Sequence, residues 1–155
     1  MSAWRRLALE KWPQYKLEIE MSNDVRDLWI FLNEKFIQAH YVPDPKLISE
    51  IYEYADWCLA NEDLAQVTLL DFYESLPDDP KVREDMVHWL RWGDLEWLSR
   101  IWQYGRTEKE HTQLMQELTE RKREGPKKTR REDKPKPGQI GYALTASSKN
   151  KRRGN

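Results

Sequence analysis

The sequence holds one cysteine, six glycines and no long apolar run, and each scarcity excludes a class of protein. A single cysteine, Cys58, permits neither an internal disulfide nor a zinc site built from several cysteines, and it fits a reducing compartment. No stretch approaches the roughly 18 apolar residues of a membrane-spanning helix, and the N-terminus lacks the apolar run of a signal peptide. We therefore expect a cytoplasmic protein that does not bind membranes.

Catalytic signatures are also missing. The sequence contains no glycine-rich dinucleotide or phosphate loop, no nucleophile elbow and no His-Glu-X-X-His motif. The sequence neighbours of Cys58 include Glu53, Asp56 and Glu62, which would raise the pKa of a thiol and disfavour a nucleophile. We expect a buried structural cysteine, no enzymatic activity and no cofactor.

Two histidines have spacings that metal sites use. Asp85 precedes His88 by three residues and Glu108 precedes His111 by three, which resembles the Glu-X-X-His motifs of di-iron helical bundles. In a chain with 27 acidic residues such spacings arise by chance. Two solvated helix faces are the preferred interpretation, with no metal, and an enzyme or metal protein built on these histidines is kept as a third hypothesis.

What the chain has in abundance is charge of opposite sign in its two parts. Residues 1–120 hold 24 acidic and 13 basic side chains, whereas residues 121–155 hold 3 acidic and 13 basic ones. Eight tryptophans, seven tyrosines and three phenylalanines supply large groups for a core. The pattern predicts one acidic all-α domain over residues 2–124 and a basic, flexible tail over residues 125–155.

Apolar periodicity predicts a compact bundle or array of about six or seven helices. The expected organising element is a helix over residues 64–76, which is apolar on nearly every side and would have to be wrapped by the others. Residues 14–22 alternate in polarity and are either an extended connection or a short helical turn. The other helices are expected over 2–12, 24–40, 45–60, from 80, over 95–102 and over 107–123.

Local signals place several helix ends. Ser22 or Asn23 is positioned to cap the helix at 24, and Asp44 precedes Pro45 in a favoured N-terminal arrangement. Asp78 or Asp79 precedes Pro80 in the same way, and Gly93 is expected to break the chain. Thr107 and Glu110 have the spacing of a capping box.

The tryptophans of residues 89–102 have two interpretations. They either pack short helices onto the core, or some of them form an exposed aromatic anchor of the kind enriched at protein interfaces. Trp92 and Trp97 are the better anchors because Trp89 and Trp102 fit the apolar faces. The flanking carboxylates would favour a basic protein partner over nucleic acid. The candidate contact residues are Asp78, Asp79, Glu84, Asp85, Trp92, Asp94, Glu96 and Trp97.

The tail favours the opposite partner. Its basic clusters would attract phosphates in a salt-dependent and largely sequence-independent way. The alternatives are a solubilising tail, a tail that folds back on the acidic domain, and another acidic partner. The candidate nucleic-acid contacts are Arg121, Lys122, Arg123, Lys127, Lys128, Arg130, Arg131, Lys151, Arg152 and Arg153.

The segment from Phe72 to Pro77, at the end of an apolar helix, resembles a pattern in an uncharacterised family of small bacterial all-helical domains. The end of the first helix at Trp12 and Pro13 is also similar to that family. The resemblance covers residues 3–120 and implies a helical fold with no established activity and no catalytic residue. Some such small acidic proteins resemble the immunity partners of toxins.

The leading hypothesis from the sequence is thus a non-catalytic protein-binding module with an acidic, tryptophan-bearing surface. An immunity-like role against a basic toxin or effector is one form of it. The alternative is a nucleic-acid or ribonucleoprotein accessory protein that binds through its basic tail.

Overall fold

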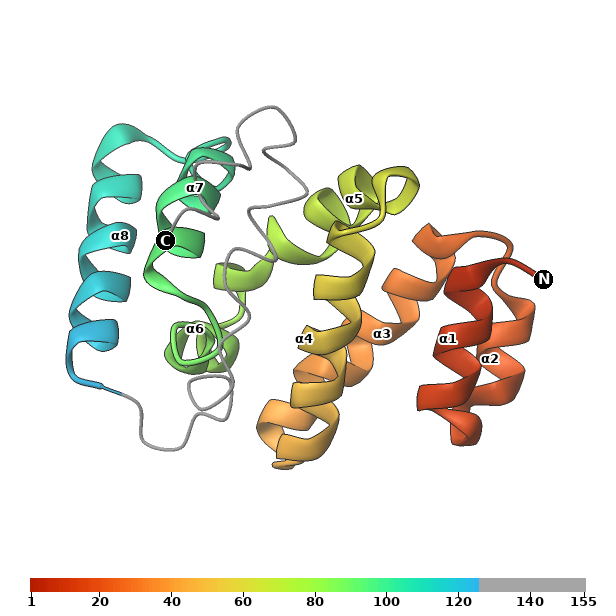
Figure 1. Ribbon diagram of the computed structural model, residues 1–155. Coiled ribbons are helices and arrows are strands. Elements are labelled where there is room, and N and C mark those ends of the chain that lie inside the picture. Colours follow the sequence, from red (N-terminus) through yellow and green to blue (C-terminus); the bar gives the residue numbers. More distant parts are fainter. Residues whose placement is uncertain (126–155) are drawn as a thin grey trace. The chain divides into compact units, whose positions relative to one another are not determined.

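The computed structural model describes residues 1–125, and these residues form helices joined by short turns (Figure 1). The all-α prediction is confirmed. The described chain has eight α-helices rather than six or seven, because Lys16–Met21 is also helical. Contacts group the chain into two compact units, Met1–Phe72 and a second that begins at Tyr73. The single domain expected over residues 2–124 stays a prediction.

The first unit contains α1 to α5. Asp24 rather than Ser22 or Asn23 caps α3, and its side chain accepts a hydrogen bond from the backbone N–H of Asp27. Asp44 caps α4 with Pro45 in the first turn, as the sequence predicts. Between α1 and α2 the chain makes a short 3-10 turn, so the helical alternative for residues 14–22 is the correct one. The bounds are α1 Ala3–Lys11, α2 Lys16–Met21, α3 Val25–Tyr41, α4 Pro45–Leu59 and α5 Glu62–Thr68.

Aromatic rings form the core of this unit. Phe72 stacks on Trp29 with ring centroids 4.9 Å apart and meets Phe36 and Tyr52 edge-on at 5.0 and 5.7 Å. Trp12 makes a further edge contact with a buried tyrosine of α4. Offset and edge-to-face pairs of this kind add to the free energy of burying the rings. The apolar periodicity of residues 24–40 predicts one buried face for α3, and this prediction is confirmed. The residues of that face, all buried, are Val25, Leu28, Trp29, Leu32, Phe36 and Ala39.

The expected helix over residues 64–76 is wrong as a single wrapped element. The α-helix α5 ends at Thr68, a π-helical turn follows over Leu69–Tyr73, and a 3-10 turn occupies Leu76–Asp78. Leu70 is 40% exposed, so the segment is not buried on all sides. Its many apolar residues have a different cause, because Phe72 fills the core of the first unit while Tyr73 and Leu76 are buried in the second.

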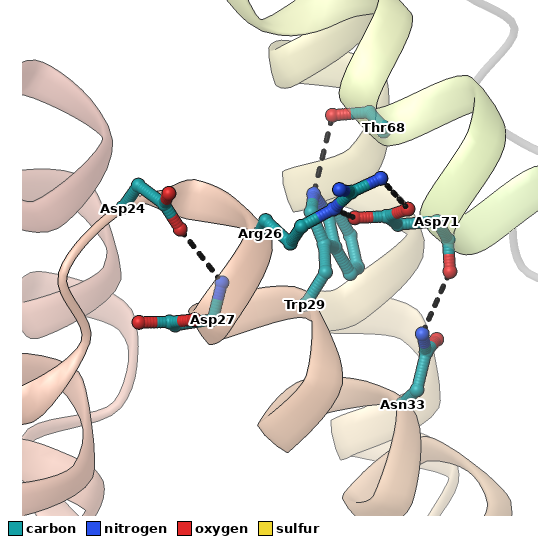
Figure 2. Close-up of polar contacts among 7 residues, drawn as sticks. All are labelled: Asp24, Arg26, Asp27, Trp29, Asn33, Thr68 and Asp71. Carbon is teal, nitrogen blue, oxygen red and sulfur yellow. Dashed lines mark hydrogen bonds and ion pairs between the residues drawn. The ribbon is translucent and has the colours of Figure 1, made fainter.

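Three side chains of α3 contact the end of α5 and the π-helical turn (Figure 2). Trp29 donates its indole N–H to the Thr68 hydroxyl over 3.2 Å, and Asn33 donates its amide to the backbone carbonyl of Asp71 over 2.7 Å. Arg26 forms a forked ion pair with the Asp71 carboxylate at 3.1 and 3.3 Å. These donors lie at i, i+3 and i+7 of α3, on one face of the helix. They stabilise a turn whose own hydrogen-bond pattern is irregular.

The second unit contains α6 Pro80–Met86, α7 Trp92–Trp102 and α8 Glu108–Arg123. Of the two expected caps for α6, Asp79 is the correct one. Gly93 does not break the chain but lies in the first turn of α7. Gly105 instead has a φ of 81°, a left-handed conformation that ends the helical segment at little cost for glycine. The capping box of Thr107 and Glu110 begins α8, as predicted.

None of the helices within residues 1–125 combines the length and the apolar character that a bilayer-spanning segment requires.

Candidate functional site

Not all residues of the acidic, tryptophan-bearing surface that the sequence predicts are exposed. Asp94 has no exposed area, and its carboxylate accepts a hydrogen bond from the backbone N–H of Arg91 over 3.0 Å. It thereby stabilises the N-terminus of α7, where a carboxylate is favoured. Asp94 is therefore a structural residue, and its assignment as a partner contact is wrong.

Two more of the predicted carboxylates also have roles within the fold. Asp79 accepts hydrogen bonds from the backbone N–H groups of Lys81 and Val82 at 2.9 and 3.2 Å. Asp85 accepts the indole N–H of Trp89 over 2.7 Å. Both side chains are half-buried, and part of their hydrogen-bonding capacity is engaged within the unit.

The remaining predicted contacts are accessible to different degrees. Trp92 is 50% exposed at the start of α7, as expected of an anchor, and Glu84 and Glu96 are exposed. Trp97 is half-buried, and its indole Nε1 is buried without a hydrogen-bond partner among the described residues. Trp92 thus fits the anchor interpretation better than Trp97.

A cleft of about 680 Å³ lies in the second unit and includes one of the predicted residues, Asp78. One part of its lining comes from the chain between Glu74 and Arg83, and the other from the α7–α8 connection and from α8 as far as Glu117. Glu110 and Glu117 lie seven residues apart on α8, which places them on the same helix face. The volume falls within the range of ligand-binding clefts.

Two ion pairs connect these parts of the lining. Arg106 meets Asp78 at 2.9 Å, and the same guanidinium donates to the carbonyl of Trp102 over 2.6 Å. Arg83 meets Glu117 at 3.5 Å and donates to the carbonyl of Pro77 over 2.8 Å. The guanidinium groups therefore hold the walls in place, and each already has carboxylate and carbonyl acceptors.

The cleft is acidic overall. Four carboxylates and two guanidinium groups line it, and Glu74 makes no ion pair with the residues that the structure describes. Glu110 accepts the backbone N–H of Thr107 over 2.9 Å in the capping box and also lines the cleft. Tyr104, which is 68% exposed, adds an aromatic face to the lining. This combination suits a cationic side chain, which a carboxylate and an aromatic ring both attract.

Sequence reasoning missed Glu74, Tyr104, Glu110 and Glu117 as members of one site. They come from three segments up to 43 residues apart, and the sequence offers no local signal that joins them. The one available hint was the i, i+3, i+4, i+7 spacing of Glu110, Gln113, Leu114 and Glu117, which places these residues on one face of a helix.

The predicted nucleic-acid contacts fall mostly outside the described residues. Of the three that are described, Arg121 pairs with Glu117 at 3.1 Å, and Lys122 donates to the backbone carbonyl of Leu90 over 2.6 Å. Arg123 is exposed. Lys127, Lys128, Arg130, Arg131, Lys151, Arg152 and Arg153 lie beyond residue 125.

Cys58 is buried in the first unit, as expected. Burial raises the pKa of its thiol to about 12, although hydrogen bonds with Thr68 and Tyr54 act in the opposite direction. A thiol with this pKa is a poor nucleophile near neutral pH.

Within residues 1–125, histidine, cysteine, aspartate and glutamate side chains do not gather in groups of three or more that could hold a metal ion.

Comparison with known proteins gives no relative. No protein-family model matches the sequence, and no curated protein or solved structure matches it.

Proposed function

We propose that the protein is a non-catalytic binding module whose second unit takes up a basic protein segment in the acidic cleft. The observation that carries the proposal is the cleft lining, to which Glu74, Glu110 and the exposed Tyr104 all belong. Lysine and arginine side chains match this lining in charge and in their affinity for aromatic faces. An immunity-like role, in which the basic segment belongs to a toxin or effector, is one form of this function.

The ion pairs of Arg83 and Arg106 favour a cationic ligand over an anionic one. Arg83 and Arg106 contact carboxylates and backbone carbonyls of their own unit, so they act as parts of the cleft wall. An anion would have to compete with these contacts and would meet four carboxylates. A cation would meet two carboxylates, Glu74 and Glu110, that no guanidinium group of the described residues engages.

The test compares two charge-neutralised variants of the full chain. Glu74→Gln with Glu110→Gln removes two charges from the cleft, and glutamine retains the capping function at position 110. Glu84→Gln with Glu96→Gln removes two exposed charges of the same unit that do not line the cleft. The probe is a fluorescein-labelled nona-arginine peptide, and its affinity is measured by fluorescence anisotropy at two salt concentrations.

We expect the cleft variant to bind the probe about tenfold more weakly, which corresponds to about 1.4 kcal/mol. The control variant should change affinity less than threefold, because exposed charges outside the contact are screened. The reverse order would place the partner on the surface around Glu84, Glu96 and Trp92 instead of the cleft. A probe that binds neither form, at low salt, would contradict the proposed function.

A further inference from the structure

The C-terminal end of α8 is a turn that leads into the basic C-terminal segment. The helix ends with Glu124 at its C-cap, and Gly125 has a φ of 85°. A glycine in this left-handed conformation directly after a helix turns the chain away from the helix axis. The next residue, Pro126, cannot continue the helix. The chain therefore leaves α8 through a turn at Gly125.

The sequence after this turn is basic, whereas the cleft is acidic. Residues 126–155 hold ten basic and two acidic side chains. Four of the basic residues, Lys127, Lys128, Arg130 and Arg131, occur within the first six positions. The cleft has two more carboxylates than guanidinium groups. The same chain therefore carries an acidic cleft and a segment with four basic side chains.

Chain length allows the two to meet. Glu117 and Glu110 precede Glu124 by seven and 14 residues, which at about 1.5 Å per residue places them roughly 10 and 20 Å back along α8. An extended chain advances about 3.3 Å per residue, so a five-residue segment such as 127–131 spans about 16 Å. Residues 126–131 can extend about 20 Å from Gly125, so a segment returning along α8 passes Glu117 midway and reaches Glu110 only when fully extended.

We infer that residues 127–131 bind in the acidic cleft of the same molecule and compete there with an external basic ligand. The competition with an external ligand regulates the same cleft and rests on the proposed function, whereas the self-binding does not. A short tether gives an effective concentration on the order of 1 mM. If the untethered segment binds with a dissociation constant on the order of 0.1 mM, self-binding lowers the affinity for an external ligand by about tenfold.

The first experiment uses two full-length variants of equal net charge. Lys127, Lys128, Arg130 and Arg131 are replaced by glutamine in one, and Lys149, Lys151, Arg152 and Arg153 in the other. The nona-arginine probe should bind the first variant about five- to tenfold more tightly than the original chain, and the second less than twofold more tightly. Equal affinities for both variants would overturn the inference, because general charge repulsion would then explain any change.

The second experiment does not depend on the probe. A carbodiimide joins a carboxylate directly to a lysine amine, and the linked peptides are identified by mass spectrometry. We expect amide links from Lys127 or Lys128 to Glu117, the cleft carboxylate about 10 Å back along α8, and none from Lys149 or Lys151 to this residue. Absence of the first links, or an equal yield of the second, would overturn the inference.

A mixture of nitrogen-15-labelled and unlabelled chains separates binding within one molecule from binding between copies. Links that carry a single isotope support the inference, and links that combine both isotopes would overturn it in favour of a dimer. If the probe binds no variant but the links form, the proposed function fails and the self-binding stands. If the probe binds the cleft and the links do not form, the reverse holds.

Discussion

Trp102 donates its indole N–H to the backbone carbonyl of Tyr73 over 2.8 Å, and neither residue has any exposed area. This bond joins the last turn of α7 to the point where the chain enters the second unit. Tyr73 directly follows Phe72, whose ring belongs to the aromatic core of the first unit. Two adjacent residues therefore serve two cores, and the indole of Trp102 fixes the backbone of the second.

Replacing Trp102 with phenylalanine should destabilise the protein by about 2 kcal/mol or more. Phenylalanine keeps an aromatic ring but leaves the Tyr73 carbonyl without its buried donor and creates a small cavity. Urea unfolding followed by circular dichroism measures the change. Trp92→Phe is the matched control, since Trp92 is 50% exposed and its replacement should change stability by less than about 0.5 kcal/mol. Equal effects would show that the hydrogen bond and the packing of Trp102 contribute little.

Asn33 should matter more to stability than Arg26, although both contact Asp71 (Figure 2). Asn33→Ala removes the donor to a carbonyl of the π-helical turn and should cost about 1–2 kcal/mol. The ion pair of Arg26 involves a side chain that is 61% exposed, and such pairs contribute little. The measurement is again urea unfolding, with the exposed neighbour Glu34→Ala as control. A larger loss for Arg26→Ala than for Asn33→Ala would contradict this order.

The sequence predicted those elements whose causes are local. The buried face of α3, the Asp44–Pro45 start of α4 and the Thr107–Glu110 capping box each depend on residues within one or two turns. The π-helical turn was not predictable in this way. Its partners on α3 precede Asp71 by 38 and 45 residues, so its geometry is a consequence of tertiary contact.

The candidate site was predicted only in part for the same reason. The sequence indicated an acidic binding surface near Asp78, but the cleft combines that residue with α8 and with Tyr104. The error at Asp94 had a local cause. Because Gly93 was interpreted as a break, the start of α7 was placed too late, and the N-terminal position of Asp94 was not recognised.

Replacing Asp94 with alanine should therefore destabilise the protein much more than replacing Glu96 with alanine. Asp94→Ala leaves the partly buried backbone N–H of Arg91 without its acceptor and should cost about 1–3 kcal/mol. Glu96→Ala changes an exposed side chain and should stay within about 0.5 kcal/mol. Thermal unfolding at constant pH distinguishes them. If the two variants melt together, Asp94 does not have the structural role that its burial indicates.

Cys58 should make stability fall at alkaline pH. Its thiol has a folded-state pKa of about 12 against an ordinary value of 9.0, so the unfolded chain releases the proton first as pH rises. The stabilising contribution is therefore complete below about pH 9 and is lost between pH 9 and 12, with a loss of about 1 kcal/mol between pH 8 and pH 10.

The Cys58→Ala variant isolates this effect, because it keeps every other titrating group. Urea unfolding at pH 8 and pH 10 should show the original chain losing about 1 kcal/mol more than the variant over this interval. An alkylating reagent gives an independent check, since Cys58 should react slowly in the folded protein at pH 8 and quickly in urea. Parallel stability losses in the two proteins, or rapid alkylation of the folded chain, would mean that the thiol is accessible to water, and the burial that raises its pKa would then be wrong.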